Sequence, residues 1–169
     1  MSAGKPAVKG FTVLELLAVV AVVAVLATLA APNIRELISS TRVRAASSDF
    51  YAALLAARSQ AIKQRANAVV EPLDATWDTG WAVKVGAQVF VQVDPLPEDV
   101  AVLVHVNEAA IAPSPITYAM NGRVSSTDQT VVIFYNASLP VQARCVGIDP
   151  SGLPRMRADT NRDGTDGCN

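Results

Sequence analysis

The chain has 169 residues, a length that suits one globular domain with room for an appended segment. It carries 14 lysines and arginines against 15 aspartates and glutamates, so the formal net charge of −1 gives no general attraction to nucleic acid or to an anionic membrane. The distribution is uneven, because Glu15 is the only charged residue from position 11 to position 31. The two cysteines, Cys145 and Cys168, fit either one disulfide formed outside the cytosol or two free thiols.

The apolar segment at 11–31 is the first element expected along the chain. As a helix it would be ~31 Å long, which matches a bilayer core of about 30 Å. An ordinary signal peptide has only roughly 7–15 apolar residues. A simple membrane anchor, with Lys5 and Lys9 on the cytoplasmic side, accounts for the length. It does not account for Glu15, because a carboxylate in hydrocarbon needs a partner. We predict that Glu15 pairs with the α-amino group created by cleavage before Phe11, in the same subunit or a neighbouring one.

Lys9-Gly10 followed by Phe11-Thr-Val-Leu-Glu15-Leu-Leu resembles the type IV prepilin motif. The resemblance implies a leader at 1–10 that a prepilin peptidase removes after Gly10, N-methylation of Phe11, and Glu15 as the fifth mature residue. It implies that 11–32 is a transmembrane and assembly helix. Pro32 predicts a kink or local loosening where the helix leaves the bilayer; alternatively, one helix ends there and another begins.

A second helical segment is expected at 33–70, as the periplasmic amphipathic half of the helix. Apolar residues recur there at spacings of three or four, which predicts one apolar stripe. The stripe comprises Ile34, Leu37, Ile38, Val43, Ala46, Phe50, Ala53, Leu54, Ala57 and Ala61. A coiled coil is disfavoured because the stripe lacks sustained heptads.

The pattern changes after Glu71-Pro72, where segments rich in β-branched and aromatic residues predict about six strands. Gly86-Ala87 favours a hairpin turn, and Asn121-Gly122 favours a type I′ turn. A long helix followed by strands predicts an α+β fold, in which the helix packs on an antiparallel sheet domain at 71–169. The expected strands start at Trp81, Gln88, Val100, Ile116, Thr130 and Val141.

This second part resembles the GspH/FimT group of minor pilins and pseudopilins. The resemblance rests on the helix segment 54–62, the stretch 77–81, Gly122-Arg123 and Ile133-Phe134. It implies a structural subunit of a type II secretion pseudopilus or type IV pilus, located first in the inner membrane as a single-pass protein with a periplasmic domain, and then in the filament. The implied partners are other pilins, the prepilin peptidase and the inner-membrane assembly platform. C-terminal disulfides are common in such exported pilins, which supports a Cys145–Cys168 bond. A simple membrane-anchored periplasmic domain is the alternative of another class.

A catalytic function is not expected. The only histidine, His105, lies in an alternating strand pattern that predicts an exposed or hydrogen-bonded strand residue. The cysteines lack the spacing of metal ligands. We therefore expect no enzyme activity and no organic cofactor.

Two polar clusters near the C-terminus suggest binding. Asp159, Asn161 and Asp163, followed by Gly164, resemble the start of a calcium-binding loop without its late glutamate, but a polar turn inside the disulfide loop is the simpler interpretation. Arg155 and Arg157 resemble the Gly-Arg-x-Arg element of DNA-binding minor pilins, but Leu153 and Pro154 separate them from Gly152. DNA uptake in natural transformation is therefore an alternative function.

Overall fold

The computed structural model describes residues 11–107, 109–160 and 168, except for the side chains of residues 29–33. The helix α1 comprises Val13–Gln64. No glycine occurs between Phe11 and Ala68, and alanine is frequent, as a long helix requires. Arg65 follows the helix with φ 52°, a left-handed conformation typical of a helix C-terminus. Because α1 continues through position 32, Pro32 does not separate two helices; the predicted kink remains a prediction.

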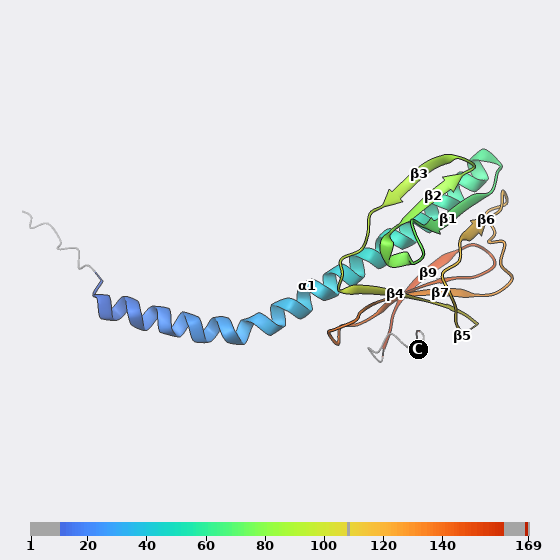
Figure 1. The fold of residues 1–169 in the computed structure, drawn as a ribbon. Helices are drawn as coiled ribbons and strands as arrows, with labels where there is room; N and C mark the ends of the chain where they lie inside the picture. Colours follow the sequence, from blue (N-terminus) through green and yellow to red (C-terminus); the bar gives the residue numbers. More distant parts are fainter. Residues whose placement is uncertain (1–10, 108, 161–167, 169) are drawn as a thin grey trace, which may run out of the picture. The chain divides into compact units, whose positions relative to one another are not determined.

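The strands form two antiparallel sheets (Figure 1). The four-stranded sheet has the order β3 (Gln88–Val93), β2 (Trp81–Val85), β1 (Ala68–Pro72), β6 (Ile116–Tyr118). The five-stranded sheet has the order β5 (Ala109–Ala110), β4 (Val100–Val106), β7 (Thr130–Asn136), β8 (Arg144–Ile148), β9 (Pro154–Ala158). A short 3-10 helix, η1 (Trp77–Thr79), precedes β2. The α+β class is confirmed.

The sequence-based count of about six strands was too low. The described residues also form β1, which the sequence placed in the helix and its boundary, and β5 and β9. β8, the strand expected from Val141, starts at Arg144. β9 was missed because Arg155 and Arg157 break its apolar pattern. The turn at Asn121-Gly122 also differs from its prediction. A type I′ turn needs a positive φ at both central residues, but only Gly122 has one, and its N–H donates to the carbonyl of Ala119 as the last residue of a turn.

The chain divides into two compact units, residues 1–35 and 36–169. In the first unit, every described side chain from position 11 to position 28 is exposed. The second unit contains the remainder of α1 and both sheets. The observed division therefore falls within α1, three residues after the boundary expected at 32.

One hydrophobic core joins the second half of α1 to both sheets. Phe50 of α1 is at its centre, with its ring centroid 5.2 Å from those of Trp77 and Trp81 and 5.5 Å from that of Phe134. Edge-on and tilted aromatic contacts of this kind are favourable beyond the area they bury. Most of the predicted apolar stripe is buried here, but Ile34, Leu37 and Ile38, at its start, are 54%, 67% and 47% exposed. The first residue of α1 that joins the core is Val43.

A smaller cluster covers the other face of the five-stranded sheet. Because neighbouring side chains in a strand point to opposite faces, Val132 and Phe134 face the main core while Ile133 faces away from it. Ile133, Ala143 and Cys145 are buried in this second cluster, and Leu103, Val131, Tyr135 and Cys168 pack against them.

Candidate functional site

The first turn of α1 contains a reciprocal capping arrangement. The Oε2 atom of Glu15 accepts hydrogen bonds from the backbone N–H of Thr12 at 3.3 Å and from its hydroxyl at 3.4 Å. The hydroxyl of Thr12 accepts one from the backbone N–H of Glu15 at 3.2 Å. This is the capping box of a helix start, and a carboxylate there also interacts favourably with the helix dipole. Glu15 therefore has a structural partner within its own chain, and its predicted pairing with the Phe11 amine remains a prediction.

The surface around this turn is apolar. Phe11 is 85% exposed, and Leu14, Leu16 and Leu17 are each more than 60% exposed. Gly10, the residue before the predicted cleavage point, lies outside the described residues. Among the residues that the structure does describe, no helix has both the length and the hydropathy needed to cross a membrane.

A polar network fixes α1 to the five-stranded sheet close to where the helix enters the second unit. Asn136, at the end of β7, donates to the Ser39 hydroxyl at 2.6 Å and to Asp99 at 3.1 Å. Its side-chain oxygen accepts from the backbone N–H groups of Ser138 and Leu139 at 2.7 and 2.6 Å. Arg42, one turn along α1, forms an ion pair of 2.9 Å with Asp99.

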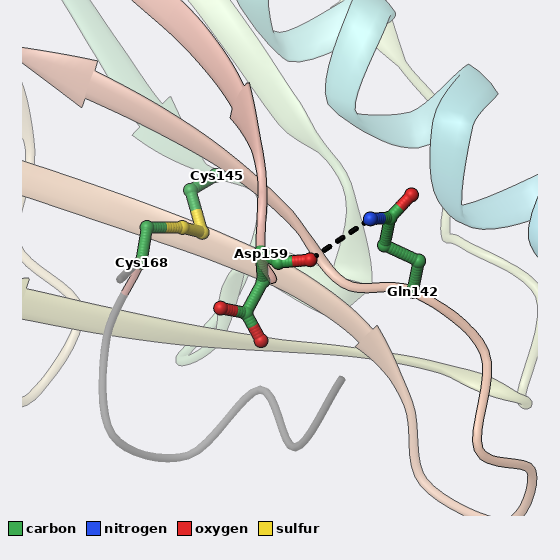
Figure 2. Close-up of a disulfide and its surroundings, with 4 residues drawn as sticks. All are labelled: Gln142, Cys145, Asp159 and Cys168. Atoms are coloured by element: carbon green, nitrogen blue, oxygen red, sulfur yellow. Dashed lines mark hydrogen bonds between the residues drawn. A yellow bond between two sulfur atoms is a disulfide. The ribbon is translucent and has the colours of Figure 1, made fainter. Parts of the chain in front are cut away.

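The C-terminal segment is tied to the sheet at two points (Figure 2). Cys145 of β8 and Cys168 form a disulfide with a Cα–Cα distance of 6.2 Å, as predicted. Asp159 directly follows β9, and its backbone N–H donates to the carbonyl of Ala143 at 3.0 Å. Its own carbonyl accepts from Gln142 at 2.9 Å. Asp159 is completely buried, whereas Asn161 and Asp163 lie outside the described residues.

Arg155 and Arg157 lie on one face of β9, opposite Gly147 and Cys145 of β8. Both arginines are exposed. Asp149, in the turn between the two strands, accepts from the hydroxyl and the backbone N–H of Ser151, the latter at 2.9 Å. These hydrogen bonds, with a smaller contribution from the charge of Arg155, lower the pKa of Asp149 below its ordinary value of 3.8. An anion approaching Arg155 would therefore meet a carboxylate beside it.

His105 differs from its prediction. It is 5% exposed, and neither ring nitrogen has a hydrogen-bond partner among the described residues. The sequence had predicted an exposed or hydrogen-bonded residue, but strand alternation directs His105 to the face of the second cluster, together with Leu103 and Val131.

Two family models match the chain. The model described as "Type II transport protein GspH" matches residues 46–152, which is more than half of the sequence. The chain belongs to the GspH family. A second model, the prokaryotic N-terminal methylation motif, matches residues 5–31 and includes the predicted cleavage point and the start of α1. The minor pilin or pseudopilin family inferred from the sequence is thus confirmed.

Solved structures support the fold of this GspH-family chain. The type IV minor pilin FimU of Pseudomonas aeruginosa is similar with a TM-score of 0.58 at 19% identity, over 72% of this chain and 90% of that one. The minor pseudopilin EpsH from the type 2 secretion system of Vibrio cholerae has a TM-score of 0.54 at 18% identity, over 69% of this chain and 97% of that one. At such identities, the likeness establishes the fold. No curated protein matches the sequence significantly.

The sequence reasoning missed two features of this GspH-family chain. The capping box has a local signature, Thr12 followed three residues later by Glu15, and could have been recognised. The Asn136 network has no local signature, because its members come from α1, the residue before β4 and the end of β7.

Proposed function

We propose that this GspH-family chain is a non-enzymatic minor subunit of a type II secretion pseudopilus. A single observation carries the proposal: the methylation motif at 5–31 leads directly into a helix whose described side chains from 11 to 28 are all exposed. An apolar helix surface of this kind requires lipid or other helices around it. The family description, a type II transport protein, is the ground for proposing the secretion filament; the fold supports both systems equally, because FimU of a type IV pilus and the pseudopilin EpsH share it.

In this proposal, a prepilin peptidase cuts between Gly10 and Phe11 and Phe11 becomes N-methylated. The mature protein waits in the inner membrane, with residues 11–32 in the bilayer and the sheets in the periplasm. The assembly platform then transfers it into the filament, where neighbouring pseudopilins surround its helix. The exposed apolar residues Ile34, Leu37 and Ile38 extend this assembly surface beyond Pro32.

Mass spectrometry of the protein from its native membrane tests the processing step. We expect a chain that begins with methylated Phe11, and an uncut N-terminus in cells with an active prepilin peptidase would contradict the proposal. Deleting the gene should then stop release of a secreted substrate while surface pili persist. The reverse result, lost pili with normal secretion, would assign the subunit to a type IV pilus.

DNA binding is a second candidate because Arg155 and Arg157 are exposed on the same face of β9. Gel-shift titration with double-stranded DNA tests it, with Arg155→Ala and Arg157→Ala combined in one variant. Binding that the double variant loses would support a role in DNA uptake. Absence of binding by the unmutated chain would remove this candidate.

A further inference from the structure

The charged residues of the second unit are unevenly distributed along the chain. Residues 36–65, which form the second part of α1 and its C-terminal end, contain five basic and two acidic residues, whereas residues 66–107 contain six acidic residues and one basic residue. The two stretches therefore carry net charges of opposite sign. Exposed charges interact only over about a Debye length, ~8 Å at physiological ionic strength, so the positions of the unpaired charges decide what they can bind.

Four of the acidic residues gather where η1 meets the loop between β3 and β4. The backbone N–H of Leu96, in this loop, donates to the carbonyl of Asp78 at 2.8 Å, and the N–H of Leu73 donates to the carbonyl of Gly80 at 3.0 Å. A Cβ at Gly80 would lie 2.9 Å from the carbonyl oxygen of Asp94, so these segments are in direct contact. The four residues are exposed, and we call them the acidic surface: Asp74, Asp78, Asp94 and Glu98.

The acidic surface forms no ion pair within the part of the chain that the structure describes. The ion pairs recorded there join Arg42 to Asp99 and Lys84 to Glu71, so both of these cations are already engaged with other carboxylates. A metal ion does not suit the surface, because the described residues include no group of three or more acidic, histidine or cysteine side chains that could hold one. Carboxylates spread in this way suit a partner surface that carries several cations.

The C-terminal end of α1 carries the opposite charge. Lys63 lies in the last turn of the helix, and Arg65 directly follows the helix. A Cβ at Gly122 would lie 2.7 Å from the Cδ1 atom of Ile62, so the turn that holds Arg123 packs against this end of the helix. A helix C-terminus favours cations by itself, which accounts for Lys63, but Arg123 comes from a different element. These residues are exposed and form no ion pair among the described residues, and we call them the basic end: Lys63, Arg65 and Arg123.

The two surfaces are too far apart to neutralise each other within one chain. Arg42 of α1 pairs with Asp99 at the end of the loop between β3 and β4, and Figure 1 shows this loop beside the middle of α1. The ring centroid of Phe50, two turns further along α1, lies 5.2 Å from that of Trp77 in η1. The acidic surface therefore lies beside this part of the helix. From Phe50 to Lys63 the helix rises ~20 Å, which is well beyond a Debye length.

We propose that the acidic surface of one copy of this chain binds the basic end of a second copy, so that copies associate head to tail. Four carboxylates on one side meet three cations on the other, and both sets are exposed. Because the two surfaces differ, each contact leaves one of each kind free and can be repeated along an axis, as in an open filament. The contact involves only the second unit and does not depend on the proposed role in secretion.

Sedimentation velocity of the full-length chain in detergent, over a range of protein concentrations, tests the proposal. Complementary charges are screened by salt, so the dissociation constant of self-association should rise at least tenfold from about 50 mM to about 500 mM NaCl. Association through the exposed apolar part of α1 would not weaken in this way, because added salt does not screen apolar contacts. Absence of self-association, or self-association that salt does not weaken, would overturn the proposal.

Two charge-reversed variants locate the contact. One combines Asp74→Lys with Asp78→Lys, and the other combines Arg65→Glu with Arg123→Glu and keeps Lys63 to stabilise the helix C-terminus. Each variant alone should associate at least tenfold more weakly than the unmutated chain, because the reversed side chains repel the unchanged surface of the next copy.

An equimolar mixture of the two variants should recover association, because the first retains the basic end and the second retains the acidic surface. The control is Asp128→Lys, at an exposed position outside both surfaces, which should associate as the unmutated chain does. Undiminished association of either variant, or a mixture that associates as weakly as the separate variants, would overturn the proposal.

Discussion

Asn136 donates a 2.6 Å hydrogen bond to the hydroxyl of Ser39, a residue 97 positions earlier in the sequence. Ser39 is 1% exposed and Asn136 is 8% exposed, so water does not compete for this contact. Ser39 lies four residues before Val43, the first residue of α1 that joins the main core. The bond therefore fixes how α1 is rotated about its axis and where it lies along that axis relative to β7, at the point where α1 becomes part of the second unit.

Asn136→Ala should lower the free energy of unfolding by about 2–4 kcal/mol. The change leaves the buried hydroxyl of Ser39 without its partner, at a cost of about 1–3 kcal/mol, and it removes two part-buried hydrogen bonds from the backbone N–H groups of Ser138 and Leu139. Urea denaturation in detergent measures the change. Asn67→Ala, at an exposed position after α1, is the control and should stay within about 0.5 kcal/mol. Equal stabilities of the two variants would show that the network contributes nothing.

Two glycines in strand connections should respond differently to alanine. Gly152 and Gly86 both have positive φ, 81° and 57°, so each alanine variant carries backbone strain of about 1 kcal/mol. A Cβ at Gly152 would overlap the carbonyl oxygen of Gly122, whereas a Cβ at Gly86 would meet nothing within 4 Å.

Gly152→Ala should therefore destabilise the fold by about 3 kcal/mol or more, because the obstacle is backbone and cannot rotate away. Gly86→Ala should cost only about 1 kcal/mol. The two midpoints of chemical denaturation, measured side by side, decide between these values. Similar midpoints would mean that the turn after β8 is loosely packed against residues 118–123, contrary to the structure.

Sequence patterns predicted those features of this chain that depend on residues close together in the sequence. The motif around Gly10 and Phe11, the apolar helix and six of the strands depend on neighbouring residues or on short periodicities. The two-sheet arrangement depends on pairings between distant segments, such as β1 with β6, and no periodicity specifies them. β9 escaped detection because its exposed arginines are compatible with an edge strand but do not indicate one.

The candidate sites divide in the same way. The pairing of Cys145 with Cys168 could be predicted because the chain has two cysteines. The burial of Asp159 could not, because it follows from the backbone bonds that hold the residue against Ala143 and Gln142. The same holds for His105, whose burial follows from the face of β4 on which it lies.

The carboxyl of Asp149 should titrate below pH 3.8, and its contribution to stability has a defined pH window. Because its pKa is lower in the folded protein, the contribution is fully present above the unfolded pKa and is lost as pH falls through the folded one. The hydrogen bond from the Ser151 hydroxyl is the largest cause of the lowering, so Ser151→Ala should raise the pKa of Asp149.

NMR titration of the side-chain carboxyl carbons measures this pKa. Ser126→Ala is the matched control, since its hydroxyl accepts from the backbone N–H of Asp128 at 3.1 Å in a similar short-range bond. It should leave the pKa of Asp149 unchanged. An identical pKa of Asp149 in the unmutated chain and in Ser151→Ala would show that the hydroxyl does not stabilise the charged form.

Two substitutions at Glu15 separate its possible roles in assembly. Glu15→Gln retains an oxygen that can accept from the Thr12 N–H, and so preserves much of the capping box, but it removes the charge. Glu15→Ala removes both. If the carboxylate pairs with the amino group of Phe11, as we propose, both variants should insert into the membrane and be processed normally yet enter filaments poorly. If the capping box is what assembly requires, only Glu15→Ala should enter filaments poorly.

Quantitative recovery of each variant in sheared filament fractions, relative to the membrane fraction, distinguishes these outcomes. Normal assembly of Glu15→Gln would refute the charge pairing.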